Sequence, residues 1–176
     1  MFVPAILITI ATFPGVIVHE LAHQLFCKWL KIPVFKVVYF QAANPAGYVL
    51  HEIVPNKWHS MLISVGPFIV NSLLGIIIAF PAALPVFKFD NANIGDYLLI
   101  YLGVSIAMHA FPSTGDANNI WKDVKDPETP FWAKIVGYPV VGIIYIGSIG
   151  SFFWLDLAYG AALAIGLPNL IVALIA

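Results

Sequence analysis

The sequence predicts an all-α polytopic membrane protein with about five transmembrane helices and a small β-hairpin between the first two. Of its 176 residues, 61% are hydrophobic and 10% are charged, whereas soluble domains carry about 25% charged residues. The mean hydropathy is +0.92. Several apolar stretches approach the length of about 20 residues that a bilayer-spanning helix needs. These observations favour a single membrane-embedded domain over residues 1–176, with a core at 1–120 and accessory helices at 131–176.

The predicted spans follow the apolar stretches in order. The first contains Pro14-Gly15, which predicts a kink. No basic segment precedes it, so we expect a retained span and not a cleaved signal peptide. The third is short and stops at Pro112, because proline cannot continue a helix. The five predicted spans cover residues 4–30, 58–83, 96–111, 131–154 and 157–176.

Two connections between the spans have distinct compositions. Residues 33–57 contain two runs rich in β-branched and aromatic residues, 35–40 and 47–54, on either side of the turn-forming residues 44–47. This arrangement predicts a β-hairpin. Residues 113–130 are polar, and we expect a water-exposed loop there.

Charge sets the predicted orientation. Seven of the eight lysines lie in or beside the connections after the first and third spans, and only Lys88 does not. Basic residues favour the cytoplasmic side, so the N-terminus is predicted outside and both connections inside. The absence of targeting signals makes us expect a prokaryotic plasma membrane. The net charge of −1 shows no excess of basic residues that would indicate nucleic-acid binding. The single cysteine, Cys27, excludes an intrachain disulfide.

The stretch His19-Glu20-Leu21-Ala22-His23 reads H-E-x-x-H. On a helix the two imidazoles share one face about one turn apart, so both can reach one zinc ion. Glu20 is placed between them to activate a zinc-bound water. Ionisable side chains on a membrane helix are costly and indicate a functional site. The alternative is a coincidental pair of hydrogen-bonding histidines beside a paired glutamate.

Catalytic zinc typically takes three protein ligands and leaves one position for water. Asp116 is the predicted third ligand, because Pro112 ends a helix shortly before it and Gly115 permits an unusual backbone. The alternative is a turn aspartate that caps a following helix. His109 is the second choice, as a ligand, as a hydrogen-bond partner of a ligand or as a packed histidine. Ordinary packing or solvated roles are expected for Cys27, His51, Glu52 and His59.

Together these residues resemble the site-2 protease family of intramembrane zinc metalloproteases. The resemblance covers residues 1–120 and rests on the H-E-x-x-H motif, on residues 64–71 and on the segment around Asp116. Residues 64–71, Ser-Val-Gly-Pro-Phe-Ile-Val-Asn, are similar to the family's Gly-Pro stretch that ends in asparagine. The Asp116 segment is similar to the pattern Asn-x-x-Pro-x-Pro-x-x-Asp-Gly.

The chain also departs from that family. Met108 or His109 stands near the position of the family's asparagine, one of the two prolines is missing, and Ala117 replaces the final glycine. The sequence contains no PDZ domain. The resemblance is therefore to a minimal form of the family.

The resemblance implies a zinc metalloendopeptidase that binds one Zn²⁺ and hydrolyses a peptide bond in or near a transmembrane segment of a membrane protein. It implies metal binding by His19, His23 and Asp116, with Glu20 as the base. Asn71 and His109 are candidates for stabilising the oxyanion or for supporting a ligand. The β-rich composition of the predicted hairpin separately suggests that it holds an unwound substrate segment by strand addition.

Two other function classes stay open. A metal-ion transporter is one, because membrane histidines and acids also line ion paths. A noncatalytic zinc-binding membrane protein is the other. The absence of an internal repeat and the presence of Glu20 favour the protease.

Overall fold

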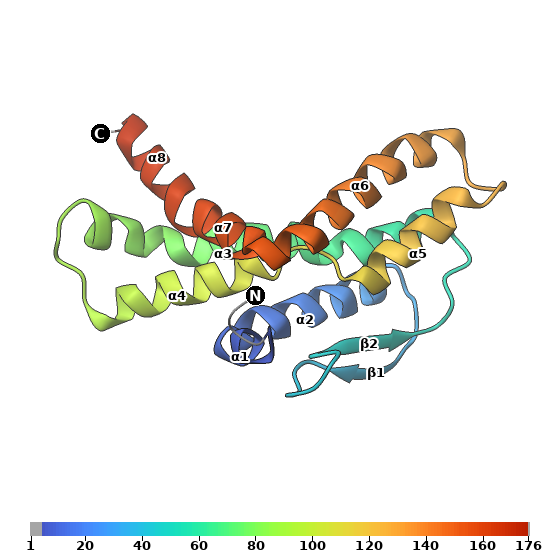
Figure 1. The fold of residues 1–176 in the computed structure, drawn as a ribbon, viewed down its shortest axis with the longest axis horizontal. Helices are drawn as coiled ribbons and strands as arrows, with labels where there is room; N and C mark the ends of the chain where they lie inside the picture. Colours follow the sequence, from blue (N-terminus) through green and yellow to red (C-terminus); the bar gives the residue numbers. More distant parts are fainter. Residues whose placement is uncertain (1–4, 176) are drawn as a thin grey trace.

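The computed structural model describes residues 5–175 and is mostly helical and elongated along one axis (Figure 1). Helices α1 (Ala5–Ala11) and α2 (Phe13–Trp29) precede strands β1 (Val34–Val38) and β2 (Tyr48–His51). A 3₁₀ turn at Ser151–Phe153 and a π-helical turn at Ala162–Gly166 interrupt the C-terminal helices. The remaining helices are α3 (Lys57–Phe87), α4 (Ile94–Met108), α5 (Thr114–Lys125), α6 (Phe131–Gly150), α7 (Leu155–Ala161) and α8 (Leu167–Ile175).

The first predicted span is broken into α1 and α2. The break lies at Thr12, slightly before the Pro14-Gly15 kink that the sequence predicts. Pro14 falls in the first turn of α2, where its missing N–H has no helical partner to lose. The proline therefore starts a new helix instead of bending a continuous one.

The hairpin prediction is confirmed. Strands β1 and β2 pair antiparallel, with Val37 opposite Val49 and Val38 opposite Tyr48. The pair lies alongside α2, so the connection between the strands reaches the part of α2 that carries the motif (Figure 1).

Helices α3 and α4 pack with their backbones close together. A Cβ atom on Gly103 would lie 2.6 Å from the Cβ of Ala79, and a Cβ on Gly75 would lie 2.7 Å from the Cβ of Ala107. Small residues at such contacts let helices approach closely, which is how helices associate within a bilayer. The contact fixes the end of α4, and with it the residues that follow Met108.

The expectation of a loop over residues 113–130 is wrong, because residues 114–125 form α5. A capping box starts this helix: the Ser113 side chain accepts from the N–H of Asp116, and the Asp116 side chain accepts from the N–H of Ser113. Ala117, Ile120 and Val124 recur at helical spacing and are buried. The polar composition is that of an amphipathic helix whose apolar stripe packs into the core.

Two of the described helical segments are long and apolar enough to cross a membrane, Lys57–Phe87 and Leu155–Leu174. Ile94–Met108 and Phe131–Gly147 are apolar but shorter, so the five spans stay a prediction. Helices α6 and α7–α8 form a V whose arms point toward opposite ends of the long axis, with the vertex near the middle (Figure 1). The last two predicted stretches therefore continue in one direction along the molecule instead of doubling back.

Candidate metal centre

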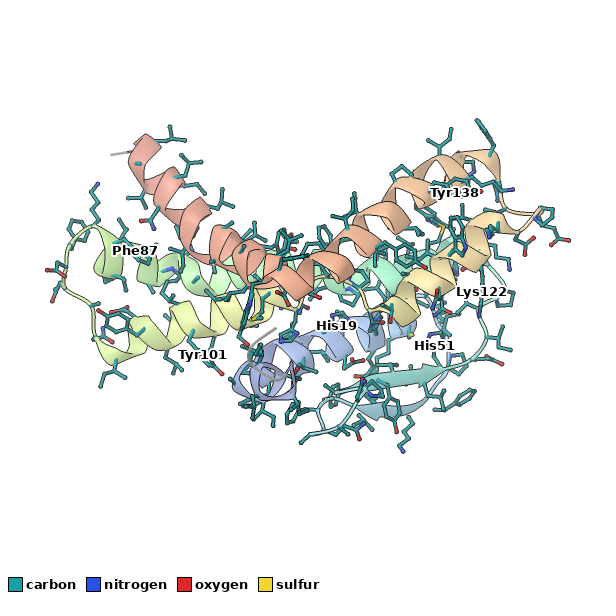
Figure 2. The ribbon with its side chains drawn as sticks, in the orientation of Figure 1. His19, His51, Phe87, Tyr101, Lys122 and Tyr138 are labelled. Atoms are coloured by element: carbon teal, nitrogen blue, oxygen red, sulfur yellow. The ribbon has the colours of Figure 1, made fainter. Side chains whose placement is uncertain are left out.

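Helix α2 turns the H-E-x-x-H motif toward the interior. His19, Glu20 and His23 expose 9%, 7% and 8% of their surfaces, whereas Leu21 and Leu25 are exposed on the outer side of the helix. The two imidazole centroids lie 4.9 Å apart, as the i, i+4 spacing predicts. His19 lies near the middle of the long axis, with Phe87 toward one end and Lys122 toward the other (Figure 2).

Each histidine of the motif is held by a backbone carbonyl. The Nδ1 of His19 lies 2.7 Å from the carbonyl oxygen of His109, and the Nδ1 of His23 lies 3.0 Å from that of Ile63. A carbonyl oxygen only accepts, so in both rings Nδ1 carries the proton. In the neutral ring this leaves the Nε2 lone pair free for a metal.

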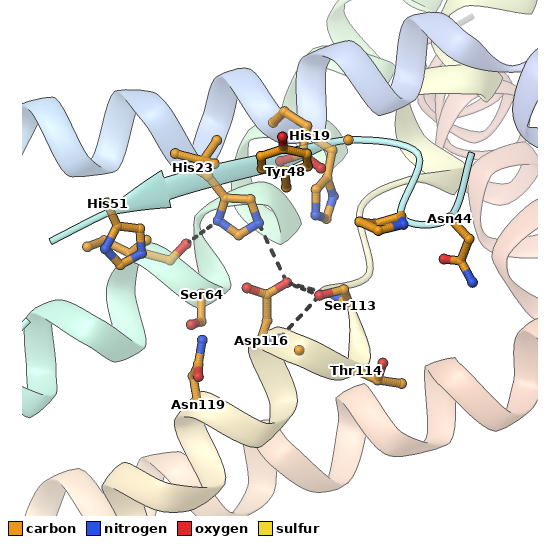
Figure 3. A pocket seen from close by; sticks show the side chains of 16 residues that line it. His19, His23, Asn44, Tyr48, His51, Ser64, Ser113, Thr114, Asp116 and Asn119 are labelled. Atoms are coloured by element: carbon orange, nitrogen blue, oxygen red, sulfur yellow. Dashed lines mark hydrogen bonds and ion pairs between the residues drawn. The ribbon is translucent and has the colours of Figure 1, made fainter. Parts of the chain in front are cut away.

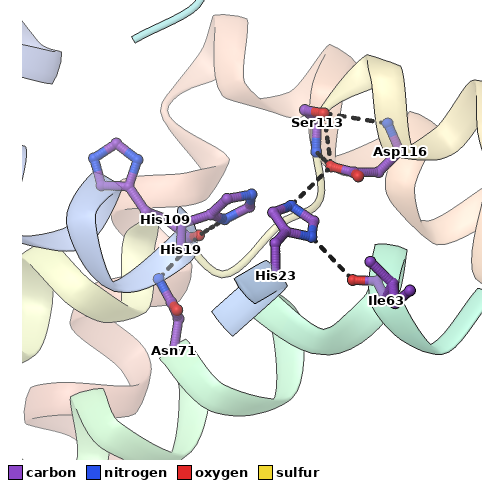
Figure 4. Close-up of polar contacts among 7 residues, drawn as sticks. All are labelled: His19, His23, Ile63, Asn71, His109, Ser113 and Asp116. Carbon is purple, nitrogen blue, oxygen red and sulfur yellow. Dashed lines mark hydrogen bonds and ion pairs between the residues drawn. The ribbon is translucent and has the colours of Figure 1, made fainter. Parts of the chain in front are cut away.

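Asp116 faces the two histidines from the first turn of α5. Its Oδ2 lies 3.5 Å from the Nε2 of His23 and accepts hydrogen bonds from the Ser113 backbone at 2.9 Å and the Ser113 hydroxyl at 2.6 Å (Figure 4). Burial raises the pKa of the Asp116 carboxyl, but the contact with the protonated form of His23 and the hydrogen bonds from Ser113 outweigh it and hold the pKa below its usual value. The carboxyl is therefore ionised at neutral pH.

Asp116 thus combines the two roles that the sequence left as alternatives. It caps α5, and one of its oxygens also joins a ligand atom of His19 and one of His23 in a group whose members all lie within 4.8 Å of one another. The elements that bring this group together are α2 and the α4–α5 junction, which lie far apart in the sequence.

Glu20 and the grouped residues line a cavity of about 410 Å³. The hairpin forms the opposite wall, where Tyr48 and His51 lie across from Asp116 and Ser113 (Figure 3). Gly47 lies against Glu20: a Cβ at position 47 would lie 2.6 Å from the Cγ of Glu20 and 2.9 Å from its Oε1. Glu20 is therefore enclosed between α2 and the hairpin connection.

The profile of the family described as "Putative zincin peptidase" matches residues 12–131. The chain belongs to this zincin peptidase family. The matched segment runs from the start of α2 to the start of α6 and contains His19, Glu20, His23 and Asp116. No curated protein and no solved structure matches the chain.

Zincin peptidases are zinc metallopeptidases, and the residues of this zincin fit that metal. Two imidazole nitrogens and one carboxylate oxygen match the donor set of catalytic zinc sites, which keep one further position open. Hydrogen bonding of both Nδ1 atoms to carbonyls is the usual support of zinc-binding histidines.

His109 approaches the site through its main chain. Its carbonyl holds His19, while the Nε2 of its ring lies 2.8 Å from the Thr12 hydroxyl, on the side away from Asp116 (Figure 4). The ring is not in the group of candidate metal ligands found among residues 5–175. The geometry therefore indicates that His109 supports His19 through its carbonyl. An oxyanion role of the His109 ring stays a prediction.

Asn71 is fully buried beneath the same junction. Its Nδ2 lies 3.2 Å from the carbonyl oxygen of Gly15, 3.1 Å from that of Ile106 and 3.2 Å from that of His109. The amide therefore ties α3 to α2 and to the end of α4. This geometry favours a positioning role for Asn71, and its predicted oxyanion role stays a prediction.

The other candidates lie outside the group. Cys27 is buried, and the Nδ1 of His51 donates to the Glu52 carbonyl although His51 lines the cavity. Sequence reasoning missed the contact of Ser113 with Asp116. The pattern of a serine followed three residues later by an acid would have indicated it, because that spacing is typical of a capping box.

Proposed function

We propose that the protein is an intramembrane zinc metalloendopeptidase of the site-2 protease type, which hydrolyses a peptide bond in or near a transmembrane segment of a membrane protein. The observation that carries this proposal is the convergence of His19, His23 and Asp116, with their ligand atoms within 4.8 Å, in a cavity that also contains Glu20.

In this proposal His19, His23 and Asp116 hold one zinc ion. Zinc bound there would supply Lewis acidity, which polarises a carbonyl and lowers the pKa of water toward neutral. Glu20 accepts the proton of the attacking water and returns it to the leaving amine. The Ile63 and His109 carbonyls keep the two imidazoles oriented while this occurs.

Membrane location is supported by the apolar surface of the helices. Only 39% of the residues in the most apolar part of α3 are buried, and only 17% of those in the most apolar part of Leu155–Leu174. Large apolar side chains, including Leu73, Ile77 and Ile146, are exposed along α3 and α6. Lipid would cover this surface, whereas the core helix of a soluble protein would bury it.

Substrate binding by strand addition is supported by the position of β2. Residues Tyr48, Val49 and His51 line the cavity beside Glu20. β2 pairs with β1 on one side, in a sheet that contains only these two strands among the described residues. An unwound substrate segment could use main-chain hydrogen bonds along the other edge of β2.

The deciding experiment compares the wild type with Glu20→Gln, and with Glu52→Gln as a matched control at an exposed glutamate. Zinc content is measured by metal analysis, and cleavage is measured on casein in detergent and on a single-span protein in vesicles. We expect about one zinc per chain in all three proteins. Cleavage should be lost only in Glu20→Gln.

Other outcomes overturn the proposal. Zinc flux across vesicles without Glu20-dependent cleavage would indicate a transporter. Bound zinc with neither flux nor cleavage would indicate a noncatalytic protein. A wild type that binds no zinc would remove the basis of all three assignments.

A further inference from the structure

A second cavity, of about 320 Å³, adjoins the first on the side of α4 and α7. The two cavities share His19, Glu20 and Ser113, so both open onto the proposed reacting centre. A substrate that crosses the centre would place residues on both sides of the scissile bond. The second cavity is thus positioned to receive a group that flanks the cleaved bond.

Asp156 lines this second cavity. It is the only charged residue after Lys134 in the sequence, in a stretch that is mostly apolar. Asp156 falls within Leu155–Leu174, a segment long and apolar enough to cross a membrane, and ionisable residues in such segments are costly and are usually functional. Asp156 lies in the first turn of α7, and none of the roles proposed for His19, Glu20, His23 and Asp116 involves it.

The fold brings Asp156 to the site. Trp154 has φ 63° at the vertex between α6 and α7, a left-handed conformation at the bend just before Asp156. Helix α7 then packs tightly on the end of α4: a Cβ on Gly160 would lie 2.8 Å from the backbone nitrogen of Met108. These contacts hold Asp156 beside Met108 and His109 in the cavity wall.

The Asp156 carboxylate is available to a ligand. Its Oδ1 accepts from the backbone N–H of Leu157 at 2.8 Å, and no ion pair or side-chain hydrogen bond of Asp156 is found among the side chains that the structure describes. A half-buried carboxylate with unused acceptor capacity gains most from a charged donor, because a charge-assisted hydrogen bond is about twice as strong as a neutral one.

We propose that the second cavity is a substrate subsite in which Asp156 binds a cationic amine or guanidinium group of the peptide. The group is either a Lys or Arg side chain close to the scissile bond or the free N-terminal amine of a short peptide. The inference rests on the proposed peptidase function and adds to it the charge that the enzyme selects.

The test begins with casein digested by the wild type in detergent, with the cleaved bonds mapped by mass spectrometry. Synthetic peptides around the fastest-cleaved bond are then made in three forms: with Lys at the flanking position, with Gln there, and with an acetylated N-terminus. We expect the wild type to cleave the preferred cationic form at least about tenfold faster in kcat/KM. Loss on Lys→Gln identifies a side chain as the source of the charge, and loss on acetylation identifies the N-terminus.

Asp156→Asn should abolish this preference and still cleave the Gln peptide, whereas Asp156→Glu should keep the preference. Asp90→Asn, an exposed aspartate between α3 and α4, is the matched control. Binding of the labelled Lys and Gln peptides to the Glu20→Gln protein supplies a readout that does not require turnover. Its preference for Lys should also depend on Asp156.

The outcomes separate the two levels of inference. Glu20-dependent cleavage with no cationic preference in the wild type overturns the subsite and leaves the peptidase standing, even if Asp156→Asn does not fold. A preference that survives in Asp156→Asn also overturns it. Absence of any Glu20-dependent cleavage, with no peptide bound by Glu20→Gln, overturns both.

Discussion

The side chain of His19 is held by the main chain of His109: the His109 carbonyl oxygen accepts a hydrogen bond of 2.7 Å from the Nδ1 of His19. The same carbonyl lies 3.2 Å from the Nδ2 of Asn71, which also reaches Gly15 in α2 and Ile106 in α4. One buried amide therefore contacts both the carbonyl that orients His19, a candidate metal ligand, and the backbones of α2 and α4.

Replacement of Asn71 by Asp tests this junction. The variant keeps the shape but places a carboxylate oxygen against three carbonyl oxygens. We expect unfolding to become easier by about 1–3 kcal/mol, the usual cost of an unsatisfied buried group, and zinc affinity to fall about 10- to 100-fold. Thermal unfolding and zinc titration measure the two effects. Asn118→Asp, at an exposed asparagine, should change neither, and equal behaviour of the two variants would refute the positioning role.

Ser113 should act through Asp116. Its hydroxyl donates to the Asp116 Oδ2 and accepts from the Asp116 N–H. Ser113→Ala should weaken zinc binding about tenfold and cost about 1 kcal/mol of stability as a lost helix cap. Ser113→Thr, which keeps the hydroxyl, should restore both. Thr114→Ala is the neighbouring exposed control, and a zinc titration in which it matches Ser113→Ala would argue against the contact.

Gly47 should be intolerant of a side chain because the hairpin connection lies against Glu20. Gly47→Val would force Glu20 or the connection to move, given the 2.6 Å approach of a Cβ to the Glu20 Cγ. We expect kcat/KM on casein to fall at least about tenfold, a change of about 1.4 kcal/mol in activation free energy, with zinc content unchanged. Ala43→Val, exposed in the same connection, should retain activity. Full activity of Gly47→Val would show that Glu20 does not depend on this wall.

The α3–α4 contact should depend on Gly103. A Cβ there would lie 2.6 Å from Ala79 and 2.7 Å from the Gly75 carbonyl oxygen, whereas a Cβ on Gly142 would meet nothing within 4 Å. Gly103→Ala should therefore destabilise the protein by about 1–3 kcal/mol. Gly142→Ala should be neutral or stabilising by up to about 1 kcal/mol, as expected for glycine in a helix. Thermal unfolding in one detergent compares the two, and the reverse order would contradict the packing.

Asp126 should stabilise the end of α5 in a pH-dependent manner. Hydrogen bonds from the Glu128 backbone and from Lys57, at 3.0 Å each, hold the pKa of its carboxyl below the usual value. A lowered pKa in the folded state adds stability above the unfolded pKa of about 3.9, and this stability is lost as pH falls through the folded pKa. The Tm of the wild type should exceed that of Asp126→Asn at pH 7, and the gap should close below about pH 4. A gap that persists in acid would rule out ionisation as its cause, and Asp90→Asn should show none.

Parts of the fold were predictable because their signals are local. The hairpin follows from two β-branched runs around turn residues, and the long α3 follows from an apolar stretch. The loop prediction for residues 113–130 was wrong because it used their polar composition and not the spacing of their apolar residues. Ala117, Ile120 and Val124 recur at helical spacing and are buried on one face of α5. The joining of α6 and α7 into a V depends on the conformation of Trp154, which no composition signal marks.

By itself the sequence determined that His19, Glu20 and His23 share a helix, since covalent spacing and helical period fix which side chains share a face. Only the tertiary structure decided that Asp116 closes on the same point, that the His109 and Ile63 carbonyls aim the imidazoles, and that Asp156 lines the adjoining cavity. These relations join segments far apart in the chain. Their geometry comes from the packing of α2, α3, α4 and α7 against one another, and spacing along the chain does not encode it.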